Sequence, residues 1–183
     1  MLIAKNPTKN IENQINEFEN LIQITLPKEL KMFLEKYNGG ETPKTYLKDR
    51  RISTDIRAFY GLGDVLYSYN KTDIVKKEGK TLLPIAIDSF GNSFLLSLDS
   101  PYDIYFKDHE KEDSMILVAK SLKEFISMCE SEVISEASRR SPEEREKILI
   151  SNGKGKNISQ GLRQMWQEEY EKYRNLVQEN VEI

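Results

Sequence analysis

The stretch TLLPIAIDSFGNSFLLSLDS, residues 81–100, limits the folds open to this chain more than any other part of the sequence. Two apolar runs, 82–87 and 93–98, flank the segment Asp-Ser-Phe-Gly-Asn at 88–92. A short Gly-bearing loop between two apolar runs is typical of a β-hairpin, because glycine adopts turn conformations that other residues avoid. The sequence therefore predicts two antiparallel strands joined by residues 88–92.

Further strands are predicted on both sides of this hairpin. The run DIYFKDHEK supplies one at 103–108. Upstream, the run RISTDIRAFYGLGD alternates apolar and polar side chains, which predicts a half-buried strand that ends at Gly61 and Gly63. A helical or irregular link is expected around residues 65–79. Consecutive strands with short links imply an antiparallel sheet.

Two helices are predicted before the sheet. Residues 11–22 place apolar side chains at helical spacing, and Asn10 is expected to cap this helix. Residues 26–37 have a second apolar face, and Pro27 suits a first turn because its missing N–H has no partner to lose there. The Asn-Gly-Gly segment at 38–40 then ends the helix, since glycine takes the left-handed conformation that closes a helix C-terminus.

Another helix start is predicted after the sheet. Ser121 and Glu124 have the spacing of a capping box. Apolar side chains follow at helical spacing as far as Val133, with Cys129 among them. Cys129 is therefore interpreted as a small core residue rather than a reactive thiol.

The last part of the chain, from about residue 138, has a different character. The Ser-Pro-Glu-Glu segment at 141–144 predicts a helix start, and Ser159 is expected to cap a last helix. That helix has a broad apolar-aromatic face, made of Leu162, Met165, Trp166, Tyr170, Tyr173, Leu176 and Val177. A monomer rarely leaves such a face in water, so the helix either folds back on the domain or meets another chain, as a homodimer seam or by docking on a partner. We predict two domains, 1–137 and a helical extension at 138–183.

Composition excludes several classes of protein. The 183 residues are 38% hydrophobic and 31% charged, which suits a single globular core with an extension. No apolar run approaches the ~20 residues that cross a bilayer, and the N-terminus lacks the pattern of a secretory signal. One cysteine and one histidine leave no internal disulfide and no His/Cys zinc set. We expect a cytoplasmic protein without membrane contact, metal or cofactor.

Charge is unevenly distributed along the chain. Residues 84–117 contain seven acids and two bases, whereas residues 44–57 contain five bases and two acids. Such runs are usually solvated faces. The alternative is a surface that steers a charged partner.

The sequence offers little catalytic chemistry. His109 is the only imidazole, and no Gly-x-Ser-x-Gly elbow is present. The glycines at 61 and 63 lack the third glycine of a dinucleotide loop, and the Gly-Lys-Gly-Lys segment at 153–156 lacks the spacing of a phosphate loop. Glutamates among the aromatics of the last helix disfavour nucleic acid. A non-enzymatic binding domain is the expected class.

Several features in order resemble the SUKH superfamily, which includes the fungal SMI/KNR cell-wall regulators. They are Leu26-Pro27 at a helix start, Phe33-Leu34 within it, Tyr37-Asn38-Gly39-Gly40 at its end, Asp88 with Gly91-Asn92 in the hairpin, Leu98-Asp99, Tyr105-Phe106, Asp108-His109-Glu110, and Ser121 with Phe125. The resemblance covers roughly residues 9–130. It implies an α+β domain with helices packed on a mostly antiparallel sheet, and it carries no catalytic residues.

The resemblance also implies a function, because bacterial members commonly act as immunity proteins that bind and block a cognate toxin, often a nuclease. Two alternatives stay open. One is a non-enzymatic scaffold or regulatory protein of the SMI/KNR type, and the other is a hydrolase that uses carboxylates.

A nuclease presents a basic cleft, so clustered carboxylates are the expected contact surface. The predicted toxin-binding residues are Asp88, Asp103, Asp108, Glu110 and Asp113, with Tyr102 and Tyr46 as aromatic anchors. The aromatic face of the last helix, if it meets another chain, either forms a homodimer seam or docks on the toxin.

Overall fold

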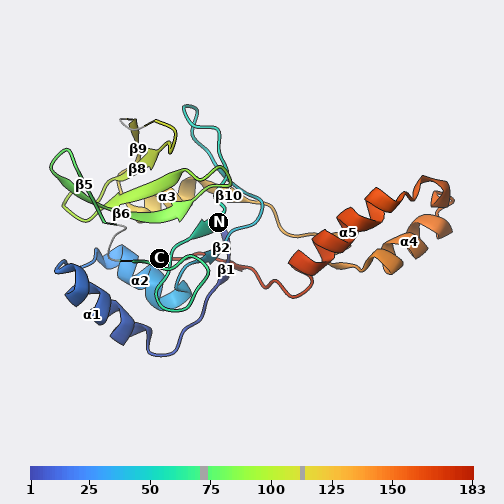
Figure 1. The fold of residues 1–183 in the computed structure, drawn as a ribbon, viewed down its shortest axis with the longest axis horizontal. Helices are drawn as coiled ribbons and strands as arrows, with labels where there is room; N and C mark the ends of the chain where they lie inside the picture. Colours follow the sequence, from blue (N-terminus) through green and yellow to red (C-terminus); the bar gives the residue numbers. More distant parts are fainter. Residues whose placement is uncertain (71–73, 112–113) are drawn as a thin grey trace. The chain divides into compact units, whose positions relative to one another are not determined.

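The computed structural model describes residues 1–70, 74–111 and 114–183 (Figure 1). These residues form two compact units, one of residues 1–132 with 178–183, and one of residues 133–177. The helices are α1 (Ile11–Ile22), α2 (Lys28–Tyr37), α3 (Leu122–Met128), α4 (Pro142–Ser151), α5 (Gln160–Tyr173), and the 3-10 turns η2 (Ala137–Arg139) and η3 (Gly155–Asn157). The strands are β1 (Leu2–Lys5), β2 (Gly40–Glu41), β3 (Thr45–Leu47), β4 (Ala58–Phe59), β5 (Val75–Lys77), β6 (Lys80–Ile87), β7 (Ser93–Ser97), β8 (Ile104–Lys107), β9 (Met115–Ala119), β10 (Cys129–Ser131) and β11 (Glu179–Asn180).

The larger unit is built on an antiparallel sheet, which confirms the predicted α+β class. Its strands follow the order β11-β1-β2-β4-β6-β7-β8-β9, and β5 pairs with β6. The predicted hairpin is present as β6 and β7, with Ile87 opposite Ser93. The predicted strand at 103–108 is β8, which places Lys107 opposite Ser93 of β7. A separate two-stranded sheet pairs β10 with β3.

Aromatic side chains form the centre of the core between the helices and this sheet. Phe33 of α2 lies 5.1 Å from the ring of Phe59 in β4, and Phe59 lies 6.0 Å from Phe125 in α3. Phe125 in turn lies 4.9 Å from Phe94 of β7. The helices therefore cover the sheet through a continuous run of tilted rings, an arrangement that aromatic pairs favour over face-to-face stacking.

The turn at 38–40 shows why the chain needs glycine there. The backbone of Asn38 has the left-handed conformation. Its buried side chain accepts a hydrogen bond from the Leu62 amide at 2.7 Å and donates one to the Leu62 carbonyl at 2.9 Å. Gly40 has a φ of +134° and pairs with Lys5 of β1, so that a Cβ at Gly40 would collide with the Ala4 carbonyl oxygen. The turn therefore brings β2 directly against β1.

Three local predictions were wrong in part. Asn10 stands at the start of α1 but makes no side-chain capping bond, because its own backbone is left-handed. Of the run RISTDIRAFYGLGD, predicted as one strand, only residues 58–59 form β4. The segment before them bonds to different partners in turn, because the Leu47 amide donates to the Thr54 carbonyl and the Arg57 amide to the Ile87 carbonyl. The link expected at 65–79 contains strand β5.

The helix that starts after Ser121 is shorter than its apolar spacing predicts. The Glu124 amide donates to the Ser121 hydroxyl at 3.1 Å, as expected of a cap. The helix ends at Met128, and Cys129 begins β10 opposite Leu47. Cys129 is buried as predicted, whereas Val133 lies exposed beyond the strand.

The C-terminus returns to the sheet, which the sequence did not indicate. Strand β11 pairs antiparallel with β1, with Leu2 opposite Asn180. The helical unit is therefore an insertion between β10 and β11. The division at residues 137 and 138 stays a prediction.

The helical unit has its own small core. Ser141 and Glu144 form the predicted capping box at the start of α4. Trp166 and Tyr173 of α5 are buried, and the Arg145 guanidinium of α4 lies 6.0 Å from the Trp166 ring and pairs with Glu169 at 2.7 Å. Met165 and Val177, predicted on the same face, are exposed.

Candidate partner-binding surface

The hairpin loop at 88–92 is held by the carboxylate of Asp88. This side chain is only 1% exposed. It accepts hydrogen bonds from the Phe90 amide at 2.9 Å and the Asn92 amide at 2.7 Å, and from the Thr54 hydroxyl at 2.6 Å. A carboxylate that satisfies several donors at once is a structural element. Asp88, predicted as a toxin contact, therefore shapes the loop from within.

This arrangement projects Phe90 out of the loop. Phe90 is 69% exposed, and Tyr46 of β3, one of the predicted anchors, is 52% exposed. Both side chains line one open groove of about 440 Å³. Two large exposed aromatic side chains beside one concavity make this groove the candidate contact surface. We call this groove, together with the exposed Glu110 of the turn that bonds to Asn92, the acidic-aromatic end.

The remaining wall of the groove is polar and firmly placed. Asp55 accepts from the Ser89 amide at 2.9 Å and also bonds the Ser89 hydroxyl. Ser53 and Thr54 also line the groove, and so does the neighbouring Ile52, which is buried. The loop that carries Phe90 is thus fastened to the segment that follows Tyr46.

The turn at 108–111 lies beside the same loop. The backbone amide of His109 donates to Asn92 Oδ1 at 3.0 Å, and His109 Nδ1 lies 2.8 Å from the same oxygen. Asp108 accepts from the Glu110 amide at 3.0 Å and pairs with Lys111 at 2.9 Å. The hydrogen bond from Lys111, reinforced by that amide, lowers the pKa of Asp108. Glu110 is left exposed on this turn.

The other predicted contacts lie elsewhere. Tyr102 and Asp103 precede β8, whereas Asp108 and Glu110 follow it, so the length of this strand, roughly 13 Å, separates the two pairs. Asp103 is buried, and it accepts from the Tyr105 hydroxyl at 3.1 Å. Tyr102 is exposed and lines a different pocket. Asp113 lies outside the residues that the structure describes.

Several acidic residues counted in the sequence are engaged by partners within the fold. Arg51 pairs with Asp49 at 2.6 Å, and its hydrogen bonds lower the pKa of Asp49. Asp99 accepts from the Thr81 amide at 2.7 Å. Within the described residues, Asp55 and Glu110 are the carboxylates of the acidic-aromatic end that no cation within 4.0 Å neutralises.

Sequence reasoning missed Phe90 and Asp55 as surface residues. Phe90 had a detectable signal, because it is a large aromatic residue at the centre of the polar loop Asp-Ser-Phe-Gly-Asn. Asp55 had none, since its position beside Ser89 results from a contact across 34 residues of sequence.

The titratable side chains that sequence analysis singled out show no catalytic arrangement. Burial raises the pKa of the Cys129 thiol to about 12, so it stays protonated at neutral pH. His109 is exposed and bonded to an amide oxygen rather than to a nucleophile. No three His, Cys, Asp or Glu side chains among residues 1–70, 74–111 and 114–183 are placed to hold a metal ion. The helices in this part of the chain are too short or too polar to cross a membrane.

Comparison with known proteins agrees with the fold. The chain is 26% identical over 149 residues to the SPbeta prophage-derived uncharacterized protein YokK of Bacillus subtilis (strain 168), a match that covers 66% of this chain and 74% of that protein. No solved structure gives a significant match. Residues 11–128, which run from the start of α1 to the end of α3, match the SMI1 / KNR4 family (SUKH-1). The chain therefore belongs to the SMI1 / KNR4 family (SUKH-1).

Proposed function

We propose that this protein is an immunity protein that binds a cognate toxin through its acidic-aromatic end and neutralises it. The observation that carries the proposal is the pair of exposed aromatic side chains, Tyr46 and Phe90, on one groove in a member of the SMI1 / KNR4 family. The proposal assigns no chemical reaction to the chain. It places the protein in the cytoplasm, where a toxin that has entered the cell would act.

The aromatic side chains supply most of the affinity in this mechanism. Aromatic residues at the centre of an interface commonly dominate its binding energy. The hydrogen bonds that the Asp88 carboxylate accepts hold the Phe90 loop before the partner arrives, which lowers the conformational entropy lost on binding. Tyr46 is held in the same way by its strand pairing with Glu130 of β10.

The two uncompensated carboxylates select the partner. Asp55 and Glu110 would pair with cationic side chains, which are common in a cleft that binds nucleic acid. A nuclease is therefore the proposed class of toxin. Because few carboxylates are free, charge is expected to affect the association rate and specificity more than the final affinity.

The test first asks whether a gene beside that of this protein encodes a toxin, and the domain of that toxin is then the partner used. Co-expression should protect the host from that domain, and the purified proteins should form a complex. Phe90→Ala and Tyr46→Ala should each weaken binding by at least about tenfold. Leu21→Ala and Met32→Ala, which truncate exposed apolar side chains on α1 and α2, serve as controls and should change little.

A second comparison examines charge. Glu110→Lys should slow association and reduce its dependence on salt, whereas Glu35→Lys, an exposed position on α2, should not. Undiminished binding by the Tyr46, Phe90 and Glu110 variants would show that the toxin contacts another face. Failure of the intact protein to bind or protect would refute the immunity role.

A further inference from the structure

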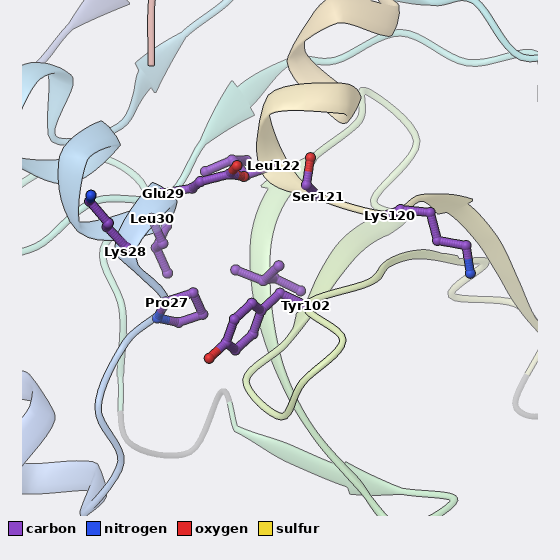
Figure 2. Close-up of a pocket in the computed structure, with 9 residues that line it drawn as sticks. Pro27, Lys28, Glu29, Leu30, Tyr102, Lys120, Ser121 and Leu122 are labelled. Carbon is purple, nitrogen blue, oxygen red and sulfur yellow. The ribbon is translucent and has the colours of Figure 1, made fainter.

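A separate pocket of about 250 Å³ lies where the first turns of α2 and α3 approach the sheet (Figure 2). Leu30 of α2, Leu96 of β7 and Leu122 of α3 line it, and all three are buried. The pocket is smaller than the 300–1,000 Å³ usual for cofactors and drug-sized ligands. Its size and apolar walls suit a single large side chain of another polypeptide.

An exposed aromatic ring stands at the mouth of this pocket. Tyr102 is 44% exposed, and Figure 2 shows its ring beside Pro27. Pro27 precedes α2 and is itself buried. A side chain inserted here would be covered by the Tyr102 ring on one side and the leucines on the other. Such a pocket is a typical receptor for an anchor residue at a protein interface.

The charge around the pocket is arranged so that cations face the solvent. Lys28 and Lys120 lie at its opposite margins, with their ammonium groups directed away from the interior (Figure 2). The Glu29 carboxylate is directed to the start of α3, where it accepts a hydrogen bond from the Lys123 amide at 3.1 Å (Figure 2). The Lys120 ammonium lies 3.7 Å from Asp103, which is buried, while the Lys120 side chain is largely exposed. The ammonium groups that a partner meets at the margins are therefore that of Lys28 and that of Lys120, the latter already paired with Asp103.

We propose that this pocket binds a large apolar side chain of a partner protein, flanked by acidic residues that pair with Lys28 and Lys120. This pocket lies at the opposite end of β8 from the turn that carries Glu110. Its partner need not be a toxin. The charge of the partner is also opposite, because the segment recognised by this pocket is acidic, whereas the partner of the acidic-aromatic end is basic. The two surfaces thus suit two segments of different charge.

The test titrates the full-length, ¹⁵N-labelled protein with three acetylated and amidated tripeptides, followed by NMR. Glu-Phe-Glu should cause saturable shifts of the Leu30, Lys120 and Leu122 amides with millimolar affinity. Lys-Phe-Lys should bind about tenfold more weakly because like charges repel. Glu-Ala-Glu should show no saturation because it lacks the anchor. Equal responses to all three peptides, or shifts confined to other residues, would overturn the proposal.

Variants make the test specific to the pocket. Tyr102→Ala removes an exposed side chain and should weaken Glu-Phe-Glu binding about tenfold. Lys120→Glu should remove the preference for Glu-Phe-Glu over Lys-Phe-Lys. Leu21→Ala is the matched control on α1 and should leave both affinities unchanged. If Tyr102→Ala binds as tightly as the unmodified protein, the pocket does not receive the anchor.

Discussion

The hydroxyl oxygen of Tyr37 accepts a hydrogen bond from the backbone amide of Glu182 at 2.8 Å. The same hydroxyl donates to the Asn180 carbonyl at 3.1 Å. Tyr37 is the last residue of α2 and is fully buried. The C-terminal strand is therefore fastened to the family domain at a site 145 residues away in sequence.

Removing this hydroxyl should loosen the C-terminal strand. Tyr37→Phe leaves the Glu182 amide and the Asn180 carbonyl without their partner, at a cost of about 1–3 kcal/mol in the free energy of unfolding. Urea unfolding measures that loss, and hydrogen exchange at the Glu182 amide should accelerate. Tyr102→Phe, at an exposed tyrosine, is the control. Unchanged exchange at Glu182 would contradict the assigned bond.

Two glycines with positive φ distinguish the cost of backbone strain from the cost of a steric collision. Gly40→Ala must keep a φ of +134° and place a methyl group against the Ala4 carbonyl, so we expect a loss above about 4 kcal/mol or failure to fold. Gly79→Ala has a φ of +74° with open space around it and should cost only about 1–2 kcal/mol. Thermal unfolding of both variants measures the difference. Equal losses would show that strain alone matters.

The Asp88 carboxylate should be needed for the shape of the loop. Asp88→Ala leaves the Phe90 and Asn92 amides and the Thr54 hydroxyl without an acceptor, which predicts a loss of about 3 kcal/mol. Chemical denaturation measures it, with Asp64→Ala on an exposed loop as control. A loss as small as that of the control would mean that the loop holds its shape without Asp88.

Trp166 is the only tryptophan and reports on the helical unit alone. Arg145→Ala removes both the pairing with Glu169 and the cation above the Trp166 ring. The free energy of unfolding of this unit, measured by Trp166 fluorescence in urea, should fall by about 3 kcal/mol. Arg163→Ala breaks a more exposed pair with Glu146 and should lower the free energy of unfolding by less than about 1 kcal/mol. Shifts of equal size would indicate that Arg145 is not part of a buried network.

The pairing of Asp108 with Lys111 should appear in a pH titration. The Lys111 hydrogen bond lowers the pKa of Asp108 in the folded state below its unfolded value. The stabilising effect of the pair is therefore present above the unfolded pKa and is lost as the pH falls through the folded pKa, which confines the loss to acid below about pH 4. NMR should show the Asp108 pKa rising towards its usual value in Lys111→Gln. An unchanged pKa would contradict this cause.

Short-range signals explain which elements the sequence predicted. Helix α2 was recognisable because its apolar spacing and the turn at 38–40 lie within a few residues of each other. The β6–β7 hairpin was recognisable for the same reason. Strands β1 and β11 were missed, because two to four residues become a strand only when a distant segment pairs with them.

The candidate site shows the same limit. Tyr46 and Glu110 were predicted as contacts, and the structure leaves both side chains exposed. Counting carboxylates could not distinguish Asp88, which is enclosed by donors, from Glu110, which is free. The hydrogen bonds that bury Asp88 come partly from Thr54, 34 residues earlier.

The sequence by itself determined the α+β class, the positions of the main helices and hairpin, and the family, because each depends on local periodicity, capping and turn residues. The tertiary structure alone decided which carboxylates lack a cationic partner and which aromatic side chains line the acidic-aromatic end. It also decided that the C-terminus returns to β1. The reason is physical. Burial and hydrogen-bond partners are properties of segments that meet in space, and those contacts join residues that the sequence keeps far apart.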